Sequence, residues 1–526
     1  RLEAAGIRQL TEVAARTPGL SLSPTQSTLA VRGFGGRAGT LTSGVGVFAD
    51  GVYVGDWRFL DAAGFFDTER IEVLRGPQSV ALGPGTVGGA VLLHSAPPPM
   101  TWQSKVVAEA GSDQLWNLQG MIRGPITDQF AMSVAGSTLH RSAWNDDPHN
   151  AGDRIARDDQ YLRAAFTYHW TNLWYSQVQA MDIDREDGAL RTALLLNEVA
   201  LGELRLKYLA SWAEREWVND GETRNAGHEV SLYSAPGAPV SFNLGLLYRD
   251  EESRLRVEPP SGDSDTLSAW LSAAAPVAER LSITAGLRYS EQNAGHGVQV
   301  SEHFRDGDLT ASYRWQHSQQ LYLRLAVGHA GPGVPGLSAN TANTANTGKL
   351  TTTEIGHKGN FLDGRIQTLL AVYRNRPDDL APAADTSYGL EWEASWQLLE
   401  DWQIGTSWAW ADSDRPPLQP QQQLSAFART DWRWGWADMA LRLDYLYQSG
   451  VCPDQQPCHG ARGESARQWD ARLYARYREW TLGIYADNLA DTRTWYSLPG
   501  HGAGTATAGE LTAPRQLGLR ITYQLR

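Results

Sequence analysis

The side chains with the clearest chemical potential are arginines that stand beside aromatic residues or in glycine-rich turns early in the chain. Trp57-Arg58-Phe59 is one such group, and Arg37 stands in a glycine-rich turn upstream of it. A guanidinium group beside aromatic rings suits an anionic, partly aromatic ligand, through charge and cation–π contact. We therefore take Arg37, Trp57, Arg58 and Phe59 as candidate ligand-binding residues. A solvated turn with one packed tryptophan is the structural alternative.

No catalytic arrangement is apparent in the sequence. It contains no Gly-x-Ser-x-Gly nucleophile elbow, no His-Glu-x-x-His zinc motif and no Walker phosphate loop. The glycines between Gly83 and Gly89 could be mistaken for a phosphate-binding loop, but no helical pattern with Lys-Ser/Thr follows them. We predict that the protein is not an enzyme, with no catalytic residues, no metal site and no cofactor.

The two cysteines of the chain, Cys452 and Cys458, lie in one short proline-containing segment that also holds His459. A disulfide that closes this loop is one interpretation, if the compartment permits it. It would stabilise the loop by about 2–3 kcal/mol, mainly by restricting its free conformations. A Cys–Cys–His metal site is the alternative, although a fourth ligand is missing nearby.

The composition is unusual for a soluble enzyme. The chain has 526 residues, 42% hydrophobic and 20% charged, with a mean hydropathy of −0.40. No stretch approaches the ~18 uninterrupted apolar residues that a membrane-spanning helix needs. Yet 52 Gly, 21 Trp and 19 Tyr stand against 2 Cys and 5 Met, which suits a membrane β-barrel with aromatic girdles at both interfaces. The formal net charge of −13 argues against nucleic acid as a partner.

From Trp102 onward, apolar and polar residues alternate with the period of two that is typical of β-strands. The clearest segment runs from Leu517 to Leu525, where Leu, Ile and Tyr alternate with Gly, Arg, Thr and Gln. A soluble all-β protein would turn the apolar face inward, whereas a transmembrane barrel turns it toward lipid and lines its lumen with the polar face. Short turns alternate with long polar loops. If the short turns all lie on one side of the membrane, counting back from the last strand gives about 22 strands, an even number that closes the barrel.

The start of the chain has a helical pattern instead. Leu2, Ile7, Leu10 and Val13 fall on one face of a helix that stops at Thr17-Pro18-Gly19. Short β segments follow.

A domain boundary is marked by Pro97-Pro98-Pro99. Before it, glycine is dense between residues 76 and 89, so the backbone there can approach other backbone closely. This suits a small domain wedged inside something larger. We therefore divide the chain into residues 1–98 and residues 99–526.

The segment from Glu69 to Pro77, Glu-Arg-Ile-Glu-Val-Leu-Arg-Gly-Pro, is similar to one in the plug domain of TonB-dependent outer-membrane receptors. Further marks of that family flank it in order: Val31 to Gly35, Val45 to Tyr53, Thr353 to Lys358, Tyr388 to Glu393, Asp487 to Asp491 and Ala513 to Gly518. The resemblance covers nearly the whole chain. It implies an all-β membrane protein of the bacterial outer membrane: an antiparallel barrel of about 22 strands with an N-terminal α+β plug inside its lumen.

The resemblance also implies a function. Members of the family perform TonB-dependent active uptake, most often of a ferric siderophore or a similar iron chelate. The implied partners are the TonB–ExbB–ExbD complex, the small ligand and outer-membrane lipid, and the receptor is expected to be a monomer. Family members carry a TonB-contacting box and a first plug strand ahead of the point where this sequence begins, so we expect the contact with TonB through a segment outside it. This compartment permits the disulfide between Cys452 and Cys458, which we predict.

Four residues match family positions at which plug arginines face barrel carboxylates. They are Arg32 and Arg75 in the plug, and Glu354 and Glu391 in the barrel. Removing one partner of a buried Arg–Glu pair costs roughly 3–5 kcal/mol, whereas a solvated pair is worth under about 1 kcal/mol. A latch of buried pairs would therefore hold the plug firmly, yet release it under a pull. Ordinary lumenal salt bridges without a gating role are the alternative.

Two other functions stay open at this point. The first is a passive porin-like protein or an uncoupled paralogue of these receptors. The second is a receptor for cobalamin or another nutrient.

Overall fold

The computed structural model describes residues 3–525 except 24–27, 38–43, 63, 144–155, 219–220, 256–260, 297, 332–347, 379–385, 414–418, 452–462, 498–499, 503–504 and 508–509. None of the helices in these described residues is long and apolar enough to cross a membrane.

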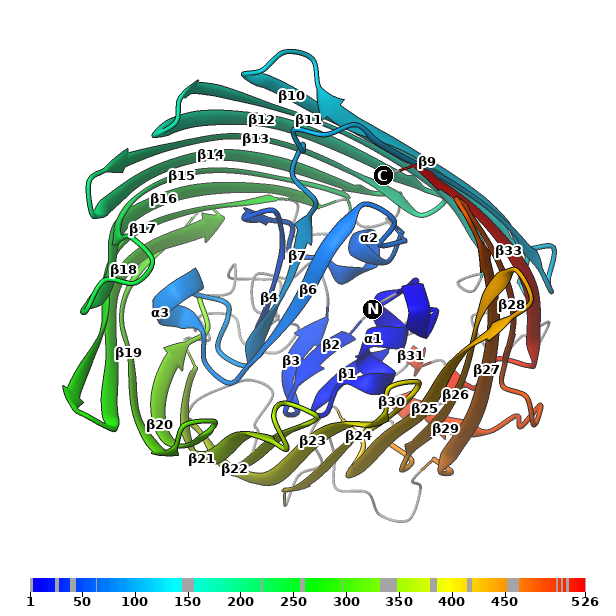
Figure 1. Cartoon of the computed structure of the whole chain (residues 1–526). Helices are drawn as coiled ribbons and strands as arrows, with labels where there is room; N and C mark the ends of the chain where they lie inside the picture. The colour runs from blue at the N-terminus through cyan, green and yellow to red at the C-terminus, as the bar shows by residue number, and fades with distance from the viewer. Residues whose placement is uncertain are drawn as a thin grey trace.

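Twenty-two antiparallel strands close into one barrel, which surrounds the N-terminal region (Figure 1). Each strand from β8 to β28 pairs with the next, and β33 closes the wall by pairing with both β28 and β8. The predicted fold class, strand number and even closure are confirmed. The wall strands are β8 (Gln103–Gly111), β9 (Trp116–Pro125), β10 (Phe130–Arg141), β11 (Arg157–Thr171), β12 (Trp174–Arg185), β13 (Gly188–Leu201), β14 (Leu204–Trp217), β15 (Gly221–Ser234), β16 (Ser241–Leu255), β17 (Ser261–Ala278), β18 (Leu281–His296), β19 (Val298–Gln316), β20 (Gln319–His329), β21 (Lys349–Phe361), β22 (Ile366–Asp378), β23 (Ser387–Leu399), β24 (Trp402–Ser413), β25 (Gln422–Trp434), β26 (Ala437–Gln448), β27 (Ala466–Tyr477), β28 (Trp480–Asp487) and β33 (Gln516–Leu525).

Two small hairpins lie in the connection between β28 and β33. One pairs β29 (Trp495–Ser497) with β32 (Glu510–Leu511), and the other pairs β30 (Gly500–Gly502) with β31 (Thr505–Thr507).

The two faces of the wall differ as the alternation predicts. On β20, Leu321, Leu323 and Leu325 are 42–46% exposed on the outer face, while Arg324 turns inward and forms an ion pair with Asp308. This apolar outer face is the one that meets lipid in an outer-membrane barrel. Exposed tryptophans gather beside the short turns, where aromatic rings mark the membrane interface; they are Trp170, Trp174, Trp315, Trp402, Trp434, Trp436 and Trp480.

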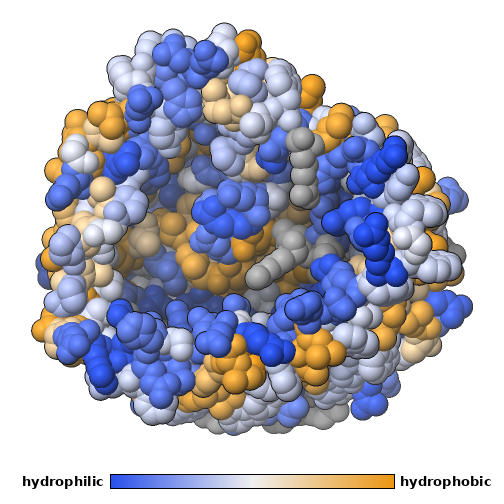
Figure 2. Space-filling model, viewed as in Figure 1, coloured by the Kyte–Doolittle hydropathy of each residue, from blue (hydrophilic) through white to orange (hydrophobic). Residues whose placement is uncertain are grey.

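The N-terminal region forms a plug inside the lumen, built from two small sheets (Figure 1). One sheet has the order β1-β2-β3, and the other has the order β5-β4-β7-β6 with β4 and β7 parallel. Figure 2 shows the mouth of the barrel hollowed around the plug, with hydrophilic residues on much of the rim and hydrophobic residues deeper inside. The plug elements are η1 (Glu3–Ala5), α1 (Leu10–Arg16), β1 (Leu20–Ser23), β2 (Thr28–Val31), β3 (Phe34–Arg37), β4 (Val45–Ala49), β5 (Val52–Tyr53), α2 (Trp57–Ala62), β6 (Thr68–Arg75), α3 (Ser79–Leu82) and β7 (Gly89–Ser95).

The predicted first helix begins later than its apolar pattern suggested. A short 3-10 turn, η1, is separated from α1 by Gly6, whose φ is +64°. A Cβ at Gly6 would lie 1.8 Å from Nε of Arg472 on the barrel wall. The chain therefore passes the wall in a conformation that favours glycine and starts a new helix at Leu10. The predicted end is confirmed, because α1 stops at Arg16.

The connection between plug and barrel runs from the end of β7 at Ser95 to the start of β8 at Gln103. We propose that the domain boundary falls at residue 98 within this connection, which gives a plug of residues 1–98 and a barrel of residues 99–526.

Candidate functional site

Arg32 joins the plug to the barrel wall. It sits in the tight turn between β2 and β3 with a φ of +52°, next to Gly33 at +81°. Its guanidinium donates from Nε to Oε1 of Glu391 at 2.9 Å and from Nη2 to Oε2 at 2.8 Å, and Nη1 donates to Oε2 of Glu354 at 2.5 Å. The side chains of Arg32, Glu391 and Glu354 are 2%, 0% and 9% exposed. The arrangement is a buried, bidentate, charge-assisted pair with a third carboxylate contact.

Arg75, at the end of β6, reaches the same carboxylate. Its Nη1 donates to Oε2 of Glu391 at 3.1 Å, and its Nη2 donates to Oε1 of Glu393 at 2.5 Å. Glu391 is therefore shared by both plug arginines, whereas Glu393 is 40% exposed. We refer to Arg32, Arg75, Glu354 and Glu391 as the latch cluster.

Further contacts from the wall support the latch cluster, and the sequence did not single them out. The Tyr322 hydroxyl donates to Oε1 of Glu354 at 2.6 Å, and the Tyr373 ring lies 4.0 Å from the Arg32 guanidinium carbon. Arg324 donates to the backbone carbonyls of Arg75 at 3.1 Å and Pro77 at 2.6 Å. The alternation of the strands could have indicated Arg324. If Glu354 faces the lumen, its cross-strand neighbour Arg324 must face the lumen too.

Charge balance keeps the plug arginines ionised. Burial by itself would lower the pKa of Arg32, but the adjacent Glu391 and Glu354 carboxylates outweigh it and hold that pKa above its ordinary value. Burial by itself would also lower the pKa of Arg75. The Glu391 and Glu393 carboxylates outweigh this effect, so the pKa of Arg75 is raised as well. The cluster is therefore an ionic contact whose strength comes from geometry and burial.

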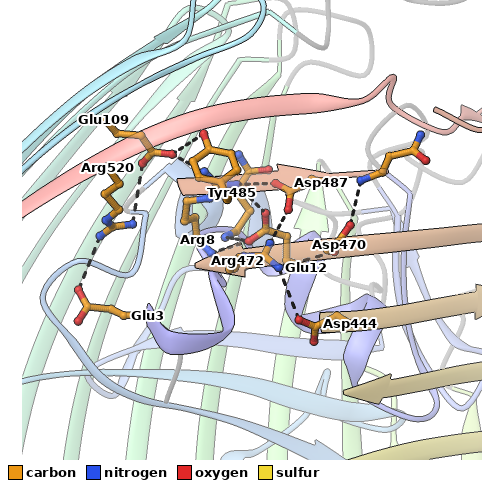
Figure 3. A network of polar contacts seen from close by, with 12 residues as sticks. Glu3, Arg8, Glu12, Glu109, Asp444, Asp470, Arg472, Tyr485, Asp487 and Arg520 are labelled. Atoms are coloured by element: carbon orange, nitrogen blue, oxygen red, sulfur yellow. Dashed lines mark hydrogen bonds and ion pairs between the residues drawn. The ribbon is translucent and has the colours of Figure 1, made fainter. Parts of the chain in front are cut away.

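A second set of charges ties the first residues of the plug to the wall (Figure 3). Arg8 donates to Oδ2 of Asp487 at 3.0 Å and forms an ion pair with Glu109, while its guanidinium carbon lies 4.5 Å from the Tyr485 ring centre. The Tyr485 hydroxyl also donates to Glu109, at 2.8 Å. Both carboxylates come from barrel strands near the closure of the wall.

Helix α1 makes the neighbouring contacts. Arg16 donates to Oδ2 of Asp470 at 3.1 Å and lies 3.6 Å from Asp444. Arg472, on the same strand as Asp470, donates to Oδ1 of Asp487 at 2.6 Å. We call this set the N-terminal network; its members are Glu3, Arg8, Glu12, Arg16, Lys105, Glu109, Asp444, Asp470, Arg472, Tyr485, Asp487 and Arg520.

Glu3 shows how this network acts on a plug residue. It forms ion pairs with Lys105 and, at 3.6 Å, with Arg520. Burial alone would raise the pKa of Glu3, but these two cations outweigh it and lower that pKa from its ordinary value of 4.5. The wall strands involved, β8, β26, β27, β28 and β33, lie around the seam where β33 closes onto β8. The beginning of the plug is thus anchored at the seam of the barrel.

Family models match both parts of the chain. Residues 1–90 match the TonB-dependent Receptor Plug Domain, and residues 102–489 match the TonB dependent receptor-like beta-barrel. The chain belongs to the TonB-dependent receptor family. It is accordingly an outer-membrane receptor of the plug-and-barrel type.

Solved structures resemble the receptor over its whole length. The ferric yersiniabactin uptake receptor FyuA from Yersinia pestis has a TM-score of 0.85 and 15% identity, and the match covers 100% of this chain and 96% of that one. The siderophore receptor PiuA from Acinetobacter baumannii has a TM-score of 0.81 and 13% identity, over 100% and 95% of the two chains. At 13–15% sequence identity, the similarity to these structures shows a shared fold only.

One curated relative is similar in sequence over a short stretch. The receptor is 32% identical over 97 residues to the iron-regulated outer membrane virulence protein of Vibrio cholerae serotype O1. This match covers 17% of the receptor and 14% of that relative.

The side chains of the candidate ligand residues Trp57 and Phe59 are buried in this structure. They lie on α2 and are 2% and 0% exposed, within the main hydrophobic core. Phe59 packs against Trp217 of the wall with ring centres 4.5 Å apart. The segment forms a helix rather than an open turn, so its aromatic side chains are buried between plug and wall.

Arg58 is occupied by neighbouring groups. It forms an ion pair with Asp56 at 2.8 Å, and its guanidinium carbon lies 3.7 Å from the Trp217 ring centre. The cation–π contact expected of this segment therefore exists, but within the protein. Arg37 ends β3, and its side chain lies outside the described residues.

The predicted disulfide cannot be placed in the same way, because Cys452 and Cys458 lie outside the described residues. Among the residues that are described, no three His, Cys, Asp or Glu side chains gather in a way that could hold a metal ion.

Proposed function

We propose that this receptor takes up a ferric siderophore or a similar iron chelate across the outer membrane by TonB-dependent active transport. In this proposal the ligand binds from the outside, above the plug. The TonB–ExbB–ExbD complex then pulls on the plug from the periplasmic side, and the proton gradient supplies the energy. In this proposal the receptor acts as a monomer embedded in outer-membrane lipid.

The observation that carries the proposal is the way the plug is held. A passive pore needs an open lumen, whereas here the plug occupies the bore and two of its arginines share the buried carboxylate of Glu391. Breaking such a contact requires work of several kcal/mol. We therefore propose that the latch cluster is a release element, which stays closed until a pull is applied.

The names of similar proteins support the choice of ligand. FyuA is a ferric yersiniabactin uptake receptor, PiuA is a siderophore receptor, and the relative from Vibrio cholerae is iron-regulated. An iron chelate is therefore favoured over cobalamin. We keep Arg37 as a candidate ligand contact and propose that Trp57, Arg58 and Phe59 support the plug surface from within rather than contact the ligand directly.

Growth on single iron sources tests the proposal. A strain that lacks the receptor would be supplied in turn with one catecholate, one hydroxamate and one carboxylate siderophore, with haem or with cobalamin. The proposal predicts that restoring the receptor rescues growth on one class of iron chelate. Rescue on cobalamin alone, or faster entry of unrelated small solutes, would instead favour another nutrient receptor or a porin.

A further inference from the structure

A cavity lies between the plug and one side of the wall, away from both the latch cluster and the N-terminal network. Its volume is about 240 Å³, and β14, β15, β16 and β18 form its outer side. A single water needs roughly 10–15 Å³ by the same kind of measure, so the cavity has room for a small polyatomic ligand with its hydration. The plug side is formed by β4, β5, α3 and β7.

Arg288 of β18 lines this cavity and lacks the partners that a buried arginine normally has. Its exposed fraction is 3%. Nη1 makes a long contact of 3.4 Å with the Val80 carbonyl, and Nε and Nη2 have no hydrogen-bond partner among the described residues. Its guanidinium carbon lies 4.9 Å from the Trp270 ring centre. A buried charge with unfilled donors is unfavourable unless a ligand of opposite charge completes it.

Asp306 is the cross-strand neighbour of Arg288, and one of its two carboxylate oxygens is used by His329. Its Oδ1 accepts from the backbone N–H of His329 at 3.0 Å and lies 2.8 Å from His329 Nδ1. Its buried Oδ2 has no hydrogen-bond partner among the described residues, and it forms no ion pair with Arg288. Within the described part of the chain no carboxylate lies at ion-pair distance from Arg288. On the plug side the guanidinium packs closely against Gly83, where an added Cβ would lie 3.1 Å from Nη2.

A second arginine adds positive charge to the same cavity. Arg249 of β16 lines the same cavity, with its guanidinium carbon 4.7 Å from the Tyr53 ring centre, and none of the ion pairs among the described residues involves it. Among the described residues that line the cavity, Lys207 and Glu229 pair with each other at 3.4 Å, whereas Arg249 and Arg288 form no ion pair.

We propose that this cavity binds an oxyanion group, a phosphate, sulfate or carboxylate, between Arg249 and Arg288. The planar guanidinium fork matches such groups in geometry as well as charge. The site goes beyond the proposed uptake function and depends neither on it nor on the latch cluster. The oxyanion comes either from a free inorganic ion or from the acidic group of a larger molecule that enters the lumen.

Equilibrium dialysis with the full chain in detergent tests the proposal, with ³²P-labelled inorganic phosphate and ¹⁴C-labelled citrate as probes. Arg288→Gln and Arg249→Gln should each weaken binding by at least about ten-fold, because each removes charge-assisted hydrogen bonds. Arg254→Gln is the matched control: Arg254 lies on β16 like Arg249, but it is exposed and paired with Glu252. It should change binding by less than about two-fold.

The two probes separate the sources. Saturable binding of phosphate indicates a free inorganic ion, and binding of citrate without phosphate indicates the carboxylate of a larger molecule. Both results support the site, provided that Arg288→Gln and Arg249→Gln weaken the binding. The proposal is overturned if neither probe binds saturably, if Arg288→Gln binds as the wild type does, or if Arg254→Gln loses binding equally.

Thermal unfolding gives an independent readout that does not rely on lost binding. Without added anion, Arg288→Gln should raise Tm, because it removes a buried unpaired charge, and it should abolish the rise in Tm that phosphate or citrate produces in the wild type. Circular dichroism would establish that the barrel is intact. A lower Tm for Arg288→Gln without anion would show that Arg288 already has the partners it needs, and would overturn the proposal.

Discussion

Replacing Glu391 by Gln tests whether the latch cluster holds the plug. Glu391 is 0% exposed and accepts two hydrogen bonds from Arg32 and one from Arg75. Glu391→Gln keeps the size of the side chain, removes the charge that both arginines share, and turns amide donors toward guanidinium donors. Breaking a buried pair in this way costs about 3–5 kcal/mol.

Two neighbouring carboxylates reduce the free-energy cost of Glu391→Gln within the range of about 3–5 kcal/mol. Glu354 still faces Arg32, and Glu393 still faces Arg75. We therefore expect the lower end, about 3 kcal/mol, which corresponds to roughly a hundred-fold shift toward the released plug.

Planar-bilayer recordings measure this shift as the frequency of open-barrel conductance. Glu391→Gln should open far more often than the wild type, whereas the matched control Glu393→Gln should change little. Glu393 lies two residues away on the same strand and face, but it is 40% exposed, so solvent weakens its ion pair to about 1 kcal/mol or less. Exchanging the charges, with Arg75→Glu and Glu391→Arg together, should restore part of the closure. If Glu391→Gln opens no more often than Glu393→Gln, the latch reasoning is refuted.

Three further predictions concern the anchor at the seam and the outer wall. Gly6→Ala should increase cleavage of the start of the plug by added protease, because a Cβ there displaces Arg472 from Asp487. The control Gly202→Ala has a similar φ of +67° but open space around it, so it should cost only about 1–2 kcal/mol of backbone strain. Equal protease cleavage in the two variants would contradict the contact between Gly6 and Arg472. The lowered pKa of Glu3 means that its contribution to docking is complete above pH 4.5 and is lost as pH falls through the lower folded value; protease release of residues 3–16 should therefore rise on acidification, and Glu3→Gln should lack that component. Ile355→Arg should destabilise the barrel by about 2–4 kcal/mol in lipid vesicles, measured by urea unfolding, because Ile355 lies at the middle of β21 on the outer face; Ile355→Val should be nearly neutral, and an arginine tolerated as well as valine would contradict the lipid-facing assignment.

The barrel could be predicted from the sequence because its rule is local. A strand with lipid on one side and a lumen on the other must alternate, as Leu517 to Leu525 does. Once that pattern repeats, turn lengths and parity determine an even strand number. Strand alternation also places Glu391 and Glu393, two residues apart, on one face, but it does not show that Arg75 contacts both.

Other parts of the site could not be predicted, because they depend on packing between distant segments. Arg16 meets Asp470, 454 residues away, and nothing near either residue indicates the contact. Trp57 and Phe59 were candidate ligand contacts, and a short segment does not show whether an aromatic side chain is exposed or buried. The helix α2 and the wall residue Trp217 bury Phe59 instead.

Accumulation of a labelled iron chelate in living cells, with and without a proton uncoupler, tests the central claim most directly. The receptor should concentrate the chelate inside cells above its outside level, and the uncoupler or loss of TonB should abolish this accumulation. Entry that only equilibrates with the medium, and that continues unchanged in uncoupled cells, would contradict the account and identify the protein as a passive pore.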